Sequence, residues 1–247
     1  MDKAKIKEFA ELIKKSNRIV FFGGAGVSTE SGMKDYRSED GLYNTVKKYN
    51  VSPETILSNS FFYSHPDIFY DFYYNYFLDT EARPNKAHYA LAQLEKVGKL
   101  TAVITQNIDA LHQQAGSKNV IELHGTTLKH YCNSCKAFMP LEQIKALHGA
   151  VPKCEKCGDI VKPAVILYEE PLDNGVINAA VNAISSADLL IIGGTSLAVY
   201  PAAGFLGYFT GDNIVLINRD ETQYDGRAAL VFRDSIGEVL SQTVNSL

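Results

Sequence analysis

Short apolar runs alternate along the chain with longer amphipathic stretches. Five runs predict buried strands, at residues 18–22, 101–105, 120–123, 189–192 and 214–217. Four stretches carry apolar residues at helical spacing and predict helices, at residues 3–15, 85–97, 174–186 and 236–247. Alternation of strands and helices predicts an α/β fold, with a parallel sheet that helices cover on both faces.

Two stretches interrupt this alternation. Residues 33–81 begin as a loop and become rich in aromatic side chains, whereas residues 126–163 contain all four cysteines. The aromatic spacing suits helices that cover a pocket, although a single aromatic residue is by default part of a core. We expect both stretches to be insertions that together form a smaller module.

The cysteines form two C-x-x-C pairs, Cys132 with Cys135 and Cys154 with Cys157, separated by 18 residues. This spacing is typical of a zinc ribbon, in which four thiolates complete a closed tetrahedral shell. A closed shell cannot activate water, so the predicted metal is one structural Zn²⁺. The alternatives are free buried thiols, a disulfide or a redox pair; a reducing cytoplasm disfavours a disulfide, and a redox motif needs only one pair.

Glycine-rich turns follow two of the predicted strands. Residues 23–29 lie directly after the first strand, and such a turn lets backbone N–H groups approach a diphosphate. The fingerprint G-x-G-x-x-G is only half present, because Thr29 stands where the third glycine would be. A second turn, residues 193–196, follows the fourth strand, and the fifth strand ends in Asn218-Arg219-Asp220, which suits a ribose or adenine. The combination favours a dinucleotide over plain tight turns.

Polar side chains follow the two middle strands. Strand 101–105 ends in Gln106-Asn107-Ile108-Asp109, at the sheet edge where α/β proteins place their chemistry. Taken alone, Asp109 is better explained as the N-cap of the next helix. His124 follows strand 120–123, where a histidine with a near-neutral pKa can serve as a general base. A lone histidine is more often structural, so both interpretations stay open on spacing alone.

In their order along the chain, these motifs resemble the sirtuin family of NAD-dependent protein lysine deacylases, specifically a compact bacterial member. The segments that carry the resemblance are Gly24–Ser28, Asp35–Ser38, Thr105–Asp109, His124-Gly125, both cysteine pairs, Gly194–Leu197 and Pro201-Ala202. The resemblance implies a Rossmann-like domain of parallel strands and a smaller domain made of a zinc ribbon and a helical module. We expect the large domain to comprise residues 1–32, 82–125 and 164–247, the helical module residues 33–81, and the zinc ribbon residues 126–163.

The resemblance also implies a reaction and roles for individual residues. NAD is cleaved to nicotinamide, and the acyl group passes from lysine to ADP-ribose as O-acyl-ADP-ribose. His124 would be the catalytic base and Asn107 a second catalytic residue, with Asp109 bonding the nicotinamide carboxamide. The implied NAD contacts are Gly24, Ala25, Gly26, Thr29, Asp35, Tyr36, Arg37, Gln106, Asn107, Ile108, Asp109, His124, Gly194, Thr195, Ser196, Asn218, Asp220 and Asp234.

The partner implied is an acylated lysine of a protein, bound as an extended peptide near Val165, Ile166, Leu167 and Tyr168. Members that prefer acidic acyl groups carry a Tyr-x-x-Arg pair. The matching stretch here is 70–73, which ends in tyrosine, so the resemblance predicts neutral acyl groups, acetyl first.

Four positions depart from the family pattern. Lys34 replaces a proline and Tyr36 a phenylalanine, whereas Gly23 replaces a common threonine and Glu169 a glycine beside the peptide groove. Tyr36 keeps the aromatic ring but adds a hydroxyl that could alter nicotinamide exchange. The Glu169 carboxylate either favours basic residues near the target lysine or points to solvent.

Composition narrows the class of protein further. Of the 247 residues, 46% are hydrophobic and 21% charged, which is ordinary for a globular protein. The formal net charge of −4 does not indicate a nucleic-acid-binding surface. The charged N-terminus does not resemble a secretion signal, and the most apolar run, residues 187–194, is too short to span a bilayer. We therefore expect no membrane association and a cytoplasmic location.

Three other functions compete with deacylation. An ADP-ribosyltransferase would pass ribose to a protein side chain or water, but His124 favours deacylation, which needs a base after nicotinamide leaves. An NAD-dependent oxidoreductase is disfavoured by the incomplete glycine fingerprint and the inserted cysteine module. A catalytically silent NAD-sensing scaffold is disfavoured by the presence of Asn107, Asp109 and His124.

Overall fold

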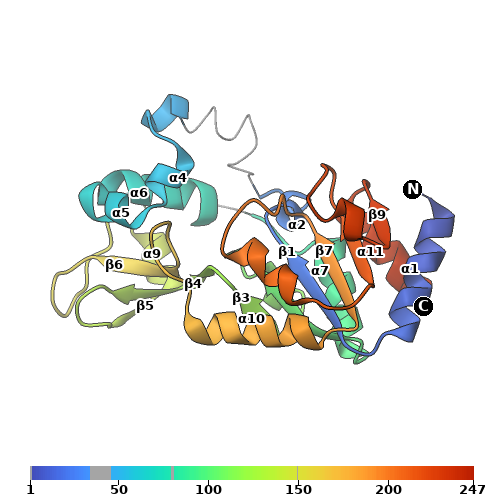
Figure 1. Cartoon of the computed structure of the whole chain (residues 1–247). Helices are drawn as coiled ribbons and strands as arrows, with labels where there is room; N and C mark the ends of the chain where they lie inside the picture. The colour runs from blue at the N-terminus through green and yellow to red at the C-terminus, as the bar shows by residue number, and fades with distance from the viewer. Residues whose placement is uncertain (1, 34–45, 79–80, 149) are drawn as a thin grey trace.

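The computed structural model describes residues 2–33, 46–78, 81–148 and 150–247, and these contain two sheets (Figure 1). The larger sheet has six parallel strands, in the spatial order β3 (Val120–Glu122), β2 (Leu100–Thr105), β1 (Ile19–Gly23), β7 (Leu189–Gly193), β8 (Ile214–Ile217) and β9 (Leu230–Phe232). The chain passes from β1 to β2 and β3 on one side, and from β7 to β8 and β9 on the other. The order reverses between β1 and β7, where open α/β sheets bind ligands.

Helices cover both faces of this sheet because its central strands are apolar on both sides. Along β1, Phe21 packs into one core cluster and Val20 and Phe22 into the other. The first cluster is completed by α1 (Lys3–Lys15), α7 (Lys86–Lys96) and α11 (Ile236–Asn245). The second is completed by α10 (Asn174–Ser186) and the 3₁₀ helix η2 (Ala202–Tyr208). In Figure 1 the two chain termini lie close together on α1 and α11, far from the smaller sheet.

The second sheet is antiparallel, in the order β5 (Phe138–Pro140), β4 (Gly125–Cys132) and β6 (Val161–Val165). The helices around it are α4 (Pro53–Ile56), α5 (Asn59–Ser64), α6 (Pro66–Tyr73), the π-helical turn η1 (Tyr74–Leu78) and α9 (Leu141–Ala146). A third apolar cluster joins these helices to the sheet. Figure 1 shows this module beside one end of the larger sheet.

Tyrosines of the aromatic stretch fasten the helices to the cysteine-bearing segment. The hydroxyl of Tyr70 donates to the carbonyl of Val161, and the hydroxyl of Tyr74 donates to a carbonyl of α9 at 2.6 Å. The hydroxyl of Tyr73 lies 3.1 Å from Nε2 of the buried His130. Both Tyr70 and Tyr73 are therefore core residues, as the default for a single aromatic of this stretch predicts.

The sequence predictions of the fold are largely confirmed. The α/β class, five strands of the large sheet and four of its helices lie where the hydrophobic pattern places them. Residues 120–123 were expected to be fully buried, but β3 is only half-buried because it forms an edge of the sheet. The three-residue β9 was not predicted. Within the described part of the chain, every helix is too short or too polar to cross a bilayer.

Two buried histidines lie between α7 and the short helix α8 (Leu111–Gln114). The ring centroids of His88 and His112 are 4.6 Å apart, and the backbone N–H of Asn85 donates to Nδ1 of His88 at 3.2 Å. Among the described residues, neither ring nitrogen of His112 has a hydrogen-bond partner. Burial lowers the pKa of His88 to about 4 and, together with the charge of His88, the pKa of His112 to about 3. Both side chains are neutral at pH 7.

These pKa values predict that the protein loses stability in mild acid. An unfolded histidine binds its proton near pH 6.5, whereas the folded His112 resists protonation until about pH 3. The unfolded state therefore binds more protons, and the free energy of unfolding falls as the pH drops below about 6.5. Replacing His112→Gln should reduce this slope by about 1.4 kcal/mol per pH unit between pH 5.5 and 4.

Urea unfolding at a series of pH values measures this slope. The matched control is His148→Gln, because His148 is exposed. Contributions from carboxyl groups and from the cysteines are common to the three proteins and cancel in the comparison. An identical slope in His112→Gln and the wild type would contradict the prediction.

Candidate active site and metal centre

An open cavity lies at the carboxyl edge of the large sheet and also reaches the smaller module. Its lining includes the first glycine turn, the polar segment after β2, and residues 165–170, which we call the strap. The described lining residues are Ala25, Ser28, Met33, Leu57, Phe77, Gln106, Asn107, Ile108, Asp109, His124, Val165, Ile166, Leu167, Tyr168, Glu169, Glu170, Leu172, Val199, Tyr200 and Pro201. The residues expected from the middle strands thus meet in one place.

A chain of hydrogen bonds fixes the polar floor of this cavity. The amide of Asn107 donates to Oγ of Ser28 at 2.9 Å, and the Ser28 hydroxyl donates to Oδ2 of Asp109 at 2.7 Å. Burial raises the pKa of Asp109, opposed by its hydrogen bonds from Ser28 and from the backbone N–H of Leu111. The N–H of Leu111 is in the first turn of α8, so Asp109 helps to cap that helix, although the N-cap position itself is Ala110.

The geometry of His124 fixes its tautomer. Its Nδ1 lies 2.9 Å from the carbonyl oxygen of Gln106. A carbonyl can only accept a hydrogen bond, so Nδ1 carries the proton in the neutral ring and Nε2 keeps its lone pair. His124 lines the cavity, and in its neutral form the ring can accept a proton at Nε2.

The two glycine turns touch each other through their backbones. The N–H of Gly26, in the short helix α2 (Gly26–Thr29), donates to the carbonyl of Gly194 at 2.8 Å. A Cβ on Gly26 would lie 2.8 Å from Cα of Gly194, and Gly194 has a positive φ of 60°. The amide of Gln106 donates to Oγ1 of Thr195 at 3.1 Å, which ties the second turn to the polar segment.

The other predicted NAD contacts surround this junction. Gly24 packs against Thr195, the hydroxyl of Thr29 donates within α2, and Ser196 is exposed. Asp234 lies just before the N-cap of α11. The predicted contacts Asp35, Tyr36 and Arg37 lie outside the described residues.

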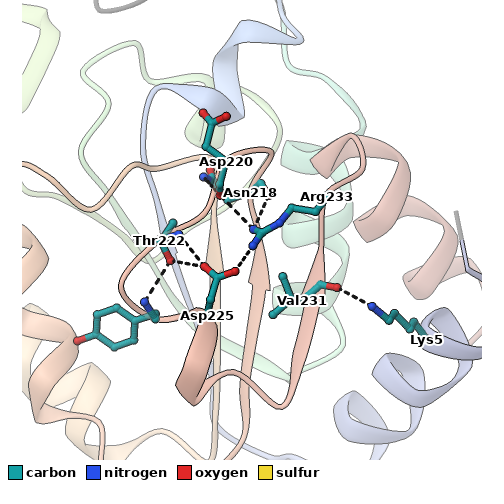
Figure 2. Close-up of polar contacts among 8 residues, drawn as sticks. Lys5, Asn218, Asp220, Thr222, Asp225, Val231 and Arg233 are labelled. Carbon is teal, nitrogen blue, oxygen red and sulfur yellow. Dashed lines mark hydrogen bonds and ion pairs between the residues drawn. The ribbon is translucent and has the colours of Figure 1, made fainter.

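Figure 2 shows how the loop after β8 is held by Arg233, the residue that directly follows β9. Arg233 donates through Nη1 to the carbonyls of Asn218 and Asp220, both at 3.0 Å, and forms an ion pair with Asp225. The N–H and hydroxyl of Thr222 donate to the same carboxylate at 2.7 and 3.0 Å. The Asp220 carboxylate points away from Arg233 in Figure 2 and is exposed. This clamp fixes the loop predicted to contact the adenosine half of NAD.

Sequence reasoning gave no role to Ser28 or Arg233. Ser28 stood within the quoted glycine motif, but only the folded chain brings its hydroxyl between Asn107 and Asp109. Arg233 follows a strand that the hydrophobic pattern did not show, and its partners lie up to 15 residues away.

The four cysteines converge as their spacing predicts. All four sulfur atoms lie within 4.8 Å of one another. The Sγ atoms of Cys132 and Cys157 are 3.3 Å apart. The Sγ atom of Cys135 lies 3.5 Å from Sγ of Cys154 and 3.6 Å from Sγ of Cys157. Sulfur atoms at about 2.3 Å from a tetrahedral zinc are separated by roughly 3.8 Å, whereas a disulfide needs about 2.05 Å. The cluster therefore fits one structural zinc ion with a complete thiolate shell.

The family model described as Sir2 family matches residues 24–201. This chain belongs to the Sir2 family. It is 56% identical over 242 residues to the NAD-dependent protein deacetylase of Clostridium perfringens, covering 98% of this chain and 99% of that one. The NAD-dependent protein deacetylase of Clostridium tetani is 56% identical over 241 residues, covering 98% of each. The resemblance to sirtuins is confirmed.

Solved structures give the same result for the fold. A Sir2–p53 peptide–NAD⁺ complex superposes with a TM-score of 0.86 at 37% identity, covering 98% of both chains. A structure of Sir2 bound to acetylated peptide has a TM-score of 0.86 at 36% identity, again covering 98% of both chains. This sirtuin therefore has the architecture of relatives that hold NAD and an acetylated peptide.

Removal of one thiolate should release the metal of this sirtuin and destabilise the smaller module. Purified wild type should contain about one zinc per chain, and Cys135→Ser should contain almost none, because three ligands leave the shell open. We expect its thermal midpoint to fall by about 10 °C or more. Metal analysis and thermal unfolding measure both effects.

Ser134→Ala is the matched control, because Ser134 is the neighbour of Cys135 and binds Asp159 through its hydroxyl. This variant should keep its zinc and most of its stability. A Cys135→Ser protein with a full complement of zinc would show that the cluster does not bind the metal as assigned.

Proposed function

We propose that this sirtuin is an NAD-dependent protein lysine deacetylase that releases nicotinamide and transfers the acyl group from lysine to ADP-ribose. The observation that carries the proposal is the convergence of the glycine turn, the Asn107–Ser28–Asp109 chain and His124 around one cavity. The names of its bacterial relatives support the same activity. Structures of relatives with NAD and with acetylated peptide support the two substrates.

Different residues of this chain are suited to bind different parts of NAD. Backbone N–H groups of the two touching glycine turns suit the diphosphate, and the clamped loop at Asn218 suits the adenosine half. Asn107 and Asp109 present an amide and a carboxyl group to the nicotinamide carboxamide, and Ser28 holds both side chains in place. Fixed polar groups of this kind accelerate a reaction by positioning its reactants. The zinc ion supplies only folding energy, because its shell has no open position.

His124 suits the role of general base. In the neutral ring, with Nδ1 donating to the Gln106 carbonyl, Nε2 carries no proton and can take one from a ribose hydroxyl. That hydroxyl would attack the acyl carbon of the imidate that forms when the acyl oxygen displaces nicotinamide from the ribose. The lysine amine then leaves, and water supplies the oxygen that completes O-acyl-ADP-ribose. An ADP-ribosyltransferase would not need this base after nicotinamide leaves, so the orientation of His124 favours acyl transfer.

The strap supports binding of the peptide. All of its residues line the cavity, and burial alternates from Val165 to Tyr168, as in an extended segment. The N–H of Ile166 donates to the carbonyl of His124 at 2.9 Å, so the strap lies directly beside the proposed base. An acyl-lysine peptide that extends along the strap would bring its acyl group to that base.

The cavity favours a neutral acyl group. Its apolar wall includes Leu57, Phe77 and Ile108. Among the described lining residues there is no lysine or arginine, whereas three of them, Asp109, Glu169 and Glu170, carry carboxyl groups. A carboxylate on the acyl chain would lose water without gaining a cationic partner.

The activity is tested by mass spectrometry of an acetyl-lysine peptide incubated with and without NAD. We expect loss of acetyl only with NAD, and formation of O-acetyl-ADP-ribose. His124→Ala should lower the turnover at least 100-fold because it removes the base, while exposed His148→Ala should not. Nicotinamide release with an unchanged peptide would instead favour ADP-ribosyl transfer or NAD hydrolysis.

Acyl preference is tested with matched peptides that carry acetyl-, butyryl- or succinyl-lysine. We expect kcat/KM for the acetyl peptide to exceed that for the succinyl peptide by about 100-fold, because none of the described lining residues is a lysine or arginine that could pair with the succinyl carboxylate. The neutral butyryl peptide separates chain length from charge. Equal rates for acetyl and succinyl peptides would contradict the proposed preference.

A further inference from the structure

The backbone of the strap is strained at one residue. Glu169 has a φ of 75°, in the left-handed region that side chains with a Cβ disfavour. The sirtuin pattern places a glycine here, and glycine adopts this conformation without cost. A glutamate persists in such a conformation only where its surroundings hold it there.

The surroundings that hold Glu169 are in the first turn of α5. Oε2 of Glu169 accepts from the backbone N–H of Ser60 at 2.8 Å, and Oε1 accepts from the Ser60 hydroxyl at 2.9 Å. The carboxylate thus binds the helical module with both oxygens and does not simply point to solvent. Hydrogen bonds to a charged acceptor are about twice as strong as neutral ones.

The residues on either side of Glu169 also form hydrogen bonds with α5 and the residues just before it. The N–H of Tyr168 donates to the carbonyl of Leu57 at 2.9 Å, and the N–H of Asn59 donates to the carbonyl of Tyr168 at 3.0 Å. Glu170 accepts from the amide of Asn59 at 2.7 Å and pairs with Lys162 at 3.0 Å. Tyr168, Glu169 and Glu170 thus each form a hydrogen bond with residues 57–60.

Glu169 also stands at the boundary between two cavities. It lines the main cavity and, with Tyr168, a second and more open cavity. Ser60 and Glu54 lie on the wall of the second cavity, which is formed mainly by α4 and α5. The contact between Glu169 and Ser60 therefore fixes the edge of the main cavity against the helical module.

We propose that Glu169 is a positioning residue for the acyl-lysine peptide, acting through its bonds to Ser60. This inference rests on the proposed function, in which the peptide extends along the strap. A strap already held in its binding conformation spares the peptide the cost of ordering it. Because both carboxylate oxygens of Glu169 accept from Ser60, its effect falls on peptide affinity and not on the chemical step.

Kinetics of Glu169→Gly, Glu169→Gln and Ser60→Ala test this role. Glycine removes the carboxylate without backbone strain, so the variant keeps its fold. We expect KM for the acetyl-lysine peptide to rise about fivefold in Glu169→Gly, with kcat and KM for NAD within about twofold of wild type. Glu169→Gln keeps an oxygen that accepts from the Ser60 N–H and should restore most of the affinity; Ser60→Ala should be intermediate.

Charge and position are separated by the choice of controls. Glu54→Gln removes a carboxylate from the same second cavity without touching Ser60, and should leave KM unchanged. Peptides with basic and with neutral flanking residues should lose affinity equally in Glu169→Gly. A loss confined to basic peptides, and equal in Glu169→Gln and Glu169→Gly, would show that the carboxylate attracts the substrate directly and would overturn the proposal.

Amide hydrogen exchange tests the contact independently of catalysis. In the absence of substrates, peptides covering residues 165–170 should exchange about fivefold faster in Glu169→Gly than in wild type. Unchanged exchange, or an unchanged KM for the peptide, would overturn the proposal. Wild-type turnover in the same assays tests the proposed deacetylase activity separately, so failure of one does not imply failure of the other.

Discussion

The site depends on the backbone contact between the two glycine turns. Because β1 and β7 are neighbours in parallel register, with Gly23 opposite Gly193, their turns leave the sheet side by side. The turns then approach closely enough for Gly26 to donate to Gly194, in a space that admits no Cβ. This contact sets the direction of α2, and therefore the position of Ser28. The glycines are thus required by the packing of the protein itself as well as by any ligand.

Two short hydrogen-bond chains extend from this junction into the cavity. One runs from Ser28 to Asn107 and Asp109. The other joins Thr195 to the side-chain amide of Gln106, and the backbone carbonyl of the same Gln106 accepts from Nδ1 of His124. The groups proposed to bind nicotinamide and to accept the ribose proton are therefore anchored to the same pair of turns. A displacement at the strand reversal would move both groups together, which explains how a sheet without reactive side chains of its own determines the chemistry.

Much of this arrangement could be predicted from the sequence, because local patterns encode it. Apolar runs gave the central strands, cysteine spacing gave the metal centre, and polar residues after strands gave the cavity floor. What could not be predicted depends on neighbours distant in sequence. The half-buried state of β3 follows from its edge position, and the hydrogen-bond partners of the Tyr70 and Tyr73 hydroxyls lie about 60 to 90 residues away. A three-residue strand such as β9 is too short to show a period.

The strap connects the two parts of the fold that form the cavity. The large sheet supplies fixed polar groups, and the module of the smaller sheet supplies an apolar wall; the strap is bonded to both, through the His124 carbonyl at one end and α5 at the other. The conformation of the strap is thus set by hydrogen bonds to both parts of the fold. A residue with unfavourable backbone geometry can be retained there, because the hydrogen bonds of its side chain offset the strain locally. Substitutions in the strap should consequently change the affinity for the peptide and leave the positions of Asn107, Asp109 and His124 unchanged.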